Sequence, residues 1–306
     1  MSATRILQPG EIESFASAAI PRLLLPESGV FRRRAERLRR LAPGHSLGDY
    51  LTFVAVIADW QQEALDAWGA PGLPDETTLY HTDRADPPLA PASWDRDPRW
   101  LNQVRELAAR LAPAAPDQAR VVLERIRTSP DDWLETQADA LLALDLTHLD
   151  IAASPILAAA LQVCWTHSAL GLDPARLPHP SQSRLCPVCG AHPIVSLVHT
   201  GGASDGLRYL VCSLCASRWY LERAKCSNCH NTRQIGYQTI ENPESAIRAE
   251  SCPECRSYLK ILYQNLTPDL DPTADDLATL ALDWLMSEEG HDRSGVDLLL
   301  LQAGSR

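Results

Sequence analysis

Apolar residues recur at helical spacing along the first half of the chain. Over residues 47–68 they fall on one face of a 3.6-residue period, which predicts an amphipathic helix capped by Ser46. A second clear helix is predicted over residues 154–171, with Ser154 as its cap and Pro155 in its first turn. Weaker helical patterns cover four further segments, residues 31–41, 100–111, 117–126 and 132–146.

The pattern changes in the second half. Residues 171–184 hold three prolines and two serines, which predicts a linker. Beyond it, short alternating segments separated by turn residues predict two hairpins. The first would have strands at 194–199 and 207–211, and the second at 235–239 and 247–249.

A closing helix is predicted near the end of the chain. Thr273 precedes Asp276 by three residues, which resembles a capping box with a shorter acid, and Gly290 ends the pattern. The apolar stripe of this helix consists of Leu277, Leu280, Ala281, Trp284 and Leu285.

Charge and hydropathy narrow the class of protein. The 306 residues include 28 Lys and Arg against 39 Asp and Glu, a formal charge of -11 that argues against a general nucleic-acid binder. The first ten residues lack the basic and apolar stretches of a secretory signal, and the longest apolar run, residues 50–58, is too short to enter a bilayer. We therefore expect a cytoplasmic protein without membrane insertion, whose reduced thiols serve metal or redox roles.

Cysteine spacing is the strongest signal. Eight of the nine cysteines form four Cys-x-x-Cys pairs: Cys186 and Cys189, Cys212 and Cys215, Cys226 and Cys229, and Cys252 and Cys255. Adding 40 to each of the first four positions gives the second four, and Ser217 matches Ser257 in the same way. The spacing predicts an internal duplication of one small module.

Two Cys-x-x-Cys turns that face each other create a tetrahedral four-sulfur site. A hairpin of roughly 30 residues buries too little apolar surface to fold alone, and a bound ion supplies on the order of 10 kcal/mol. We predict two metal ions, the first on Cys186, Cys189, Cys212 and Cys215, and the second on Cys226, Cys229, Cys252 and Cys255. A cross-braced pairing would break the repeat. Geometry leaves iron and zinc open, and the Cys186-Pro-Val-Cys-Gly190 turn looks like a rubredoxin knuckle, which favours iron.

The predicted fold class is α+β. A mainly helical N-terminal domain precedes two tandem rubredoxin-like or zinc-ribbon four-cysteine β modules and a C-terminal helix. The predicted boundaries are 1–170 for the helical domain, 171–184 for the linker, 185–224 and 225–265 for the modules, and 266–306 for the closing helix and tail.

Several other features receive simpler interpretations. Cys164 is expected to be core packing, and the arginines of residues 32–40 a solvated helix face. The proline-rich segment 71–98 is expected to be a surface excursion. Three histidines beside the knuckles are expected to be hydrogen-bonding surface groups: His192, His199 and His230. The chain shows no nucleotide-binding loop, nucleophile elbow or metalloprotease motif, so we predict that it is not an enzyme.

Taken together, these residues resemble the formate dehydrogenase accessory protein family, FdhE. The resemblance lies in the four knuckles and their flanks: Cys186-Pro-Val-Cys-Gly190, Leu207-Arg-Tyr209 before Cys212-Ser-Leu-Cys215, Lys225-Cys-Ser-Asn-Cys229, Cys252-Pro-Glu-Cys255 and Ser257-Tyr-Leu-Lys-Ile-Leu-Tyr263. It continues through Ala274-Asp-Asp-Leu-Ala278, Glu288-Glu-Gly290 and Arg293-Ser-Gly-Val296, and more loosely through Gly48-Asp-Tyr-Leu51 after His45. One departure is Asp297, where members of the family tend to carry Asn.

The resemblance implies a function that the spacing alone does not. The family acts in the cytoplasm on the catalytic subunit of respiratory formate dehydrogenases, before export by the twin-arginine route, and its members look like rubredoxin-type iron proteins. A maturation factor is therefore expected, and its -11 charge would suit the Arg-bearing signal segment of that partner. The alternatives are a redox protein that acts on thiols or a cofactor of the client, and a nucleic-acid-binding zinc ribbon.

Overall fold

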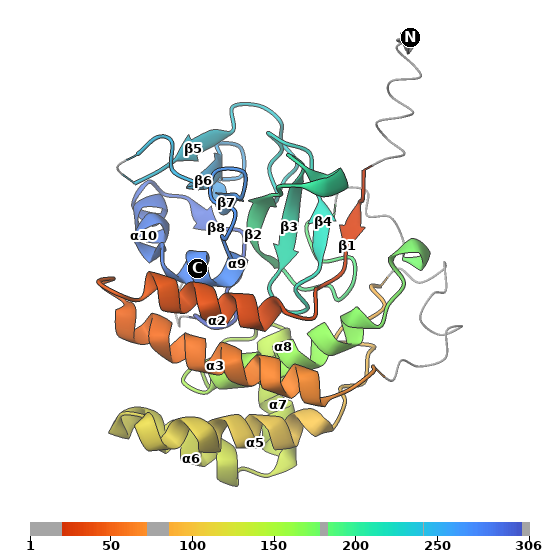
Figure 1. The fold of residues 1–306 in the computed structure, drawn as a ribbon, viewed down its shortest axis with the longest axis vertical. Helices are drawn as coiled ribbons and strands as arrows, with labels where there is room; N and C mark the ends of the chain where they lie inside the picture. Colours follow the sequence, from red (N-terminus) through yellow and green to blue (C-terminus); the bar gives the residue numbers. More distant parts are fainter. Residues whose placement is uncertain (1–19, 72–85, 178–182, 241, 302–306) are drawn as a thin grey trace, which may run out of the picture.

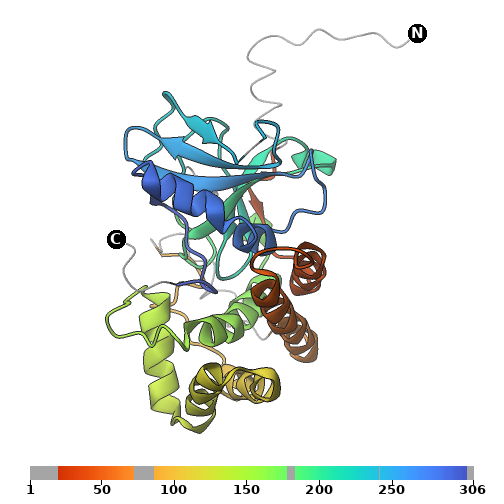
Figure 2. The same cartoon turned by 90° about the vertical axis from the view of Figure 1, so that its left-hand side faces the viewer.

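Helices make up the first half of the chain and strands most of the second half. The computed structural model describes residues 20–71, 86–177, 183–240 and 242–301. A helical layer lies beneath a twisted sheet, and two short C-terminal helices lie between them and at the side of the sheet (Figures 1 and 2). The predicted α+β fold class is confirmed.

The predicted helices of the first half are present. They are α2 (Val30–Leu41), α3 (Gly48–Ala67), α5 (Arg99–Leu111), α6 (Asp117–Thr128), α7 (Asp131–Leu142) and α8 (Ser154–Leu170). The helix predicted over residues 132–146 is shorter in the structure. It ends at Leu142, because Leu144 adopts a left-handed conformation (φ 54°).

The two predicted caps are wrong. No side chain caps α3, and Leu47 occupies its N-cap position instead of Ser46. His45 fixes this corner, since its Nδ1 accepts a hydrogen bond from Leu47 N at 3.0 Å. A side chain at Gly48 would come within 2.6 Å of Ala42 O, so only glycine fits there. Ser154 lies one residue inside α8, and its hydroxyl donates to the carbonyl of Ile151 rather than accepting from the helix.

In the part of the chain that the structure describes, the strands form one sheet of eight, and both predicted hairpins are part of it. Its strands are β1 (Leu23–Leu24), β2 (Pro193–Val198), β3 (Arg208–Cys212), β4 (Arg218–Tyr220), β5 (Gly236–Gln238), β6 (Ile247–Cys252), β7 (Ser257–Tyr263) and β8 (Asp292–Arg293). The order is β1-β4-β3-β2-β7-β6-β5, with β8 beside β7. The central pair, β2 and β7, is parallel, with Ser196 opposite Ile261. The two four-cysteine modules therefore share one sheet.

An N-terminal segment closes one edge of this sheet. Leu23 pairs with Trp219 on β4, and Tyr220 N donates to Arg22 O at 2.9 Å. A strand of two residues has no periodic signal, so the sequence does not predict it. Its effect is to pair an edge that would otherwise expose unpaired backbone groups.

The closing helix is divided into α9 (Pro272–Leu277) and α10 (Leu280–Glu288). Asp271 caps α9 by accepting hydrogen bonds from two backbone amides, so the predicted Thr273 cap is wrong. The predicted apolar stripe is wrong in part: Trp284 is 67% exposed, whereas Leu282 and Met286 pack against the sheet.

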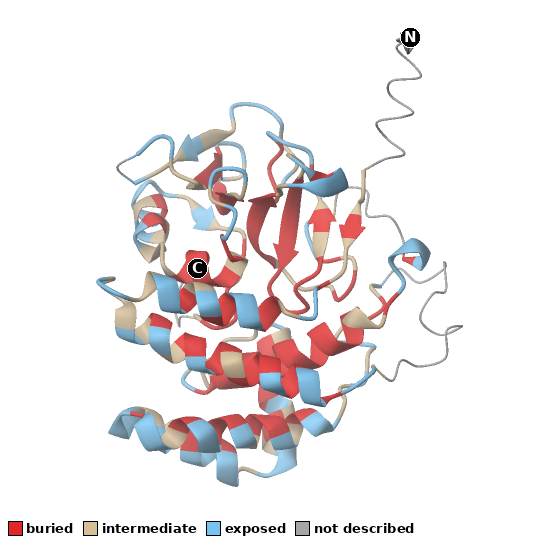
Figure 3. Cartoon of the chain, in the orientation of Figure 1, coloured by how far each residue is buried: buried red, intermediate tan, exposed pale blue. Residues whose placement is uncertain are grey.

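One hydrophobic core includes both the helical half and the first module (Figure 3). Gln162 on α8 donates to the carbonyl of Ser213 at 2.8 Å, and Leu89 N donates to Val188 O at 2.9 Å. Leu89 is fully buried, so the surface interpretation of the proline-rich segment is wrong at this residue and its neighbour Pro88, whereas the other described residues of 86–98 are exposed or partly exposed. Residues 72–85 lie outside the described residues.

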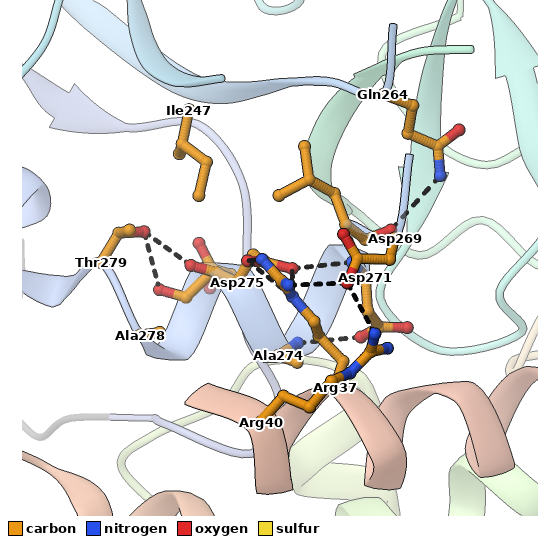
Figure 4. Close-up of polar contacts among 12 residues, drawn as sticks. Arg37, Arg40, Ile247, Gln264, Asp269, Asp271, Ala274, Asp275, Ala278 and Thr279 are labelled. Carbon is orange, nitrogen blue, oxygen red and sulfur yellow. Dashed lines mark hydrogen bonds and ion pairs between the residues drawn. The ribbon is translucent and has the colours of Figure 1, made fainter. Parts of the chain in front are cut away.

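The arginine-rich face of α2 is not wholly solvated, which contradicts the sequence interpretation. Figure 4 shows Arg37 reaching from α2 to Asp275 on α9, where its Nη2 lies 2.7 Å from Oδ1. Arg37 also contacts Asp269 at 3.0 Å, which Arg40 shares. Arg34 is buried and donates to two glutamine side chains of α3 and α8. The contacts of Arg37 and Arg40 join the helical half to the C-terminal segment.

Candidate metal centres

The structure brings the eight cysteines together in two groups of four. The first cluster consists of Cys186, Cys189, Cys212 and Cys215, and the second of Cys226, Cys229, Cys252 and Cys255. Within each cluster all the sulfur atoms lie within 4.8 Å of one another. These are the groups that sequential pairing predicts, and no cross-braced set is among them.

The sulfur spacing suits a four-coordinate ion. Across the first cluster, Sγ of Cys186 lies 3.6 Å from that of Cys215, and Sγ of Cys189 lies 3.4 Å from that of Cys212. A tetrahedron with metal–sulfur bonds of about 2.3 Å has edges of about 3.8 Å. Each cluster is therefore large enough for one ion with little movement of the backbone.

The 40-residue repeat is visible in the backbone of the knuckles. Gly190 N donates to Cys186 O at 2.8 Å, and His230 N donates to Cys226 O at 3.1 Å. Gly190 and His230 are both left-handed, with φ of 78° and 63°. Ala216 and Arg256 correspond in the same way in the other knuckles, with φ of 58° and 51°. A non-glycine residue is strained in this conformation, so cluster geometry rather than local preference holds it there.

The serine shared by the two copies has a specific contact. Ser217 Oγ lies 3.2 Å from Sγ of Cys215, and Ser257 Oγ lies 3.0 Å from Sγ of Cys255. Backbone amides contact other sulfurs: Val188 N donates to Sγ of Cys186 at 3.4 Å. Such donors stabilise negative sulfur, which is the form that binds a metal.

Burial opposes thiolate formation at most of these positions. Desolvation raises the pKa of four thiols: Cys186, Cys189, Cys226 and Cys229. Burial also opposes ionisation of Cys215 and Cys255, but hydrogen bonds from neighbouring thiols and from Ser217 or Ser257 outweigh it. They lower the pKa of Cys215, and that of Cys255 to about 7. A cation that binds to either cluster must therefore displace protons from the thiols whose pKa is raised.

The second cluster has polar neighbours that the sequence analysis missed. Asn228 Nδ2 and Asn231 Nδ2 each lie 3.7 Å from a sulfur, those of Cys255 and Cys252. Val188 and Ala191 stand 40 residues earlier, so a position-by-position comparison of the two copies shows the difference.

The other candidate residues lie outside both clusters. Cys164 is buried in α8, and burial raises its pKa to about 12, in agreement with a core role. The three histidines are half-buried rather than surface groups, and burial lowers the pKa of each: His192, His199 and His230. Among the described helices, none has the length and apolar character needed to cross a membrane.

A helical half packed against a sheet that carries two four-cysteine clusters defines an α+β protein with two candidate four-thiolate metal centres. The chain belongs to the FdhE family, as three family models show: "FdhE, N-terminal" matches residues 20–181, "FdhE, central domain" 185–223 and "FdhE, C-terminal domain" 224–300.

Proteins similar to this chain match it over nearly its full length. A protein named FdhE homolog from Edwardsiella ictaluri is 43% identical over 291 residues, which cover 94% of each chain. Another from Pseudomonas aeruginosa is 39% identical over 305 residues, which cover 98% of each. The crystal structure of the FdhE protein from Pseudomonas aeruginosa superposes with a TM-score of 0.80 and 36% identity, covering 93% of this chain and 100% of that one.

Proposed function

We propose that this protein is an accessory factor for respiratory formate dehydrogenase. It binds the catalytic subunit in the cytoplasm and is required for assembly or activation before twin-arginine export. The observation that carries the proposal is the extent of the FdhE similarity, which includes the helical half, both clusters and the C-terminal segment. In this role the protein binds and positions a client and does not turn over a substrate.

We also propose that each cluster holds one metal ion, with iron in a rubredoxin-type site favoured over zinc. The donor set supports one ion in each cluster, since four sulfurs converge there and backbone amides contact them, and the rubredoxin-like Cys186-Pro-Val-Cys-Gly190 knuckle favours iron. Iron would supply one-electron redox chemistry, whereas zinc would supply none. Metal analysis with an absorption spectrum tests this assignment, because an oxidised four-thiolate iron site is red and a zinc site is colourless.

The outer face of α10 is the contact that we propose for the client's signal segment. Trp284 is 67% exposed and lies one helical turn from the exposed Glu288. An exposed tryptophan beside acidic residues complements a segment with arginines followed by apolar residues. The net charge of -11 favours the approach of such a segment.

Co-purification with the catalytic subunit tests the accessory role directly. In a strain that lacks this gene, the wild-type chain should restore formate dehydrogenase activity and co-purify with the subunit. Trp284→Ala should weaken binding by about thirtyfold, the effect of losing an interface anchor worth about 2 kcal/mol. Val121→Ala is the matched control, because Val121 is 70% exposed on α6 in the other half of the chain.

Two results would overturn these proposals separately. Normal formate dehydrogenase activity in the deletion strain, with no association between the two proteins, would contradict the accessory role. Full client binding by the Trp284 variant would contradict only the assignment of the contact to α10.

A further inference from the structure

The two clusters differ in their access to solvent, although they repeat one sequence pattern. Each sulfur-bearing residue of the first cluster is at most 3% exposed. In the second cluster Cys229 is exposed and Cys255 is partly exposed, while Cys226 and Cys252 are buried. The members of one matched pair, Cys189 and Cys229, therefore lie at opposite extremes of exposure.

The helical half covers the first cluster. Its knuckle backbones are fixed by Gln162 from α8 and by Leu89, at 2.8 and 2.9 Å. Trp219 is fully buried beside it, and its indole N–H donates to Ser183 O at 2.9 Å. All four cysteines belong to the core that includes α3, α5 and α8. Opening this cluster therefore requires the helices to separate from the sheet.

The second cluster lies away from the helical half. Its first knuckle is contacted from outside by Arg184, whose Nη1 lies 3.3 Å from Asn228 Oδ1 in an exposed hydrogen bond. The buried side of this cluster consists of Cys226 and Cys252. Ser227 is buried next to Cys226, and its hydroxyl lies 3.5 Å from that of Ser294. A solvent molecule or ligand can approach Cys229 without any displacement of the core.

We propose that the second cluster is a metal-exchange site, at which an incoming thiol replaces Cys229 as a ligand, and that the first cluster is closed to exchange. This inference depends on the proposal that both clusters bind metal. An ion held by four sulfurs exchanges most easily where a new donor reaches it, and thiols are the soft donors that suit such an ion.

The exchange step balances without electron transfer. The incoming thiol gives up its proton as its sulfur bonds to the ion, and the bond from the ion to Sγ of Cys229 breaks. The freed sulfur of Cys229 takes up that proton, so the ion keeps four sulfur ligands and an unchanged oxidation state. This replacement is the first of the ligand exchanges by which the second module would pass its ion to, or take it from, a thiol-bearing molecule while the first module stays folded.

Chelator challenge of the zinc-loaded full chain tests the inference. With 4-(2-pyridylazo)resorcinol as the zinc probe, we expect one equivalent to be released at least tenfold faster than the other. Added glutathione should accelerate only the fast phase. Alkylation after loss of the first equivalent, mapped by mass spectrometry, should label Cys226, Cys229, Cys252 and Cys255 and leave the first cluster unlabelled.

Matched variants assign the phases. Cys229→Ser should remove the fast equivalent, and Cys189→Ser, at the corresponding position of the first copy, should remove the slow one. If the latter variant does not fold, the alkylation map of the wild-type chain still decides the question. Equal release rates, or first labelling in the first cluster, would overturn the inference. A chain that binds neither iron nor zinc would instead refute the proposal that the clusters are metal sites, and this inference with it.

Discussion

Asp297 carries a carboxyl group whose surroundings predict a pH-dependent loss of stability. The residue is 5% exposed, and its Oδ1 accepts a hydrogen bond from Leu299 N at 2.9 Å. Its Oδ2 has no partner among the described residues, and neither has Oδ2 of the neighbouring Asp276. Burial and, to a smaller extent, the negative charge of Asp276 raise the pKa of Asp297 to about 7, although the positive charge of Arg293 acts in the opposite direction. A proton shared between the two carboxyl groups would give both Oδ2 atoms a hydrogen-bond partner.

The magnitude follows from the size of this shift. An unfolded aspartate titrates near pH 3.9, so the penalty for ionising Asp297 is absent below about pH 4 and grows between about pH 4 and 7. Above pH 7 it reaches its full value, on the order of 4 kcal/mol for a shift of this size. In Asp297→Asn, an amide donor would replace the shared proton and carry no such penalty.

Denaturant unfolding of both proteins between pH 5 and pH 9 measures the effect. The free energy of unfolding of Asp297→Asn minus that of the wild type should rise with pH and level off above pH 7. The difference cancels the pH dependence that the two cysteine clusters contribute to both proteins. A difference that stays constant across this range would refute the reasoning.

Three further predictions concern the interdomain contact and the clusters. Arg37→Ala should lower the free energy of unfolding by about 3–5 kcal/mol, because it leaves the buried carboxylate of Asp275 without its charged partner. Arg32→Ala should change the free energy of unfolding by less than about 1 kcal/mol, since the ion pair of Arg32 with Asp66 is exposed. Urea unfolding of both variants tests this difference. Cys212→Ser should reduce bound metal from two ions to one by elemental analysis, and loss of both ions would contradict independent clusters. Metal affinity should fall as pH falls from 8 to 6, because binding displaces protons from thiols of raised pKa, and a competition titration that gives equal affinity at both pH values would contradict this.

Local periodic patterns were sufficient to predict much of this fold. The helices α3 and α8 and the two hairpins each repeat a helical or alternating pattern over several turns or pairs, and all are present. The grouping of the cysteines was predictable because the 40-residue repeat permits few arrangements. Such features depend on residues that are close in sequence or related by duplication.

Contacts between distant segments were not predictable in the same way. The sequences of β2 and β7 do not indicate that these strands pair in parallel, because both strands are largely apolar whatever their partner. Arg34 and Arg37 belong to a run of arginines that the sequence alone indicates to be a solvated helix face. Their partners lie in other helices, which the local sequence does not reveal. The exposure of Cys229 against the burial of Cys189 depends on where the helical half lies, which the repeat itself does not encode.

The pairing of β1 with β4 has a consequence for the order of folding during synthesis. Leu23 leaves the ribosome early, but its partner Trp219 follows only after the whole helical half has been made. Arg37 likewise waits for Asp275, and Tyr50 for the carbonyl of Leu299 that its hydroxyl contacts at 3.0 Å. Contacts so distant in sequence form late and slow the final step. The nascent helical half therefore remains incomplete until the C-terminal residues arrive, so a chain truncated before α9 lacks the partners that hold its first helices in place.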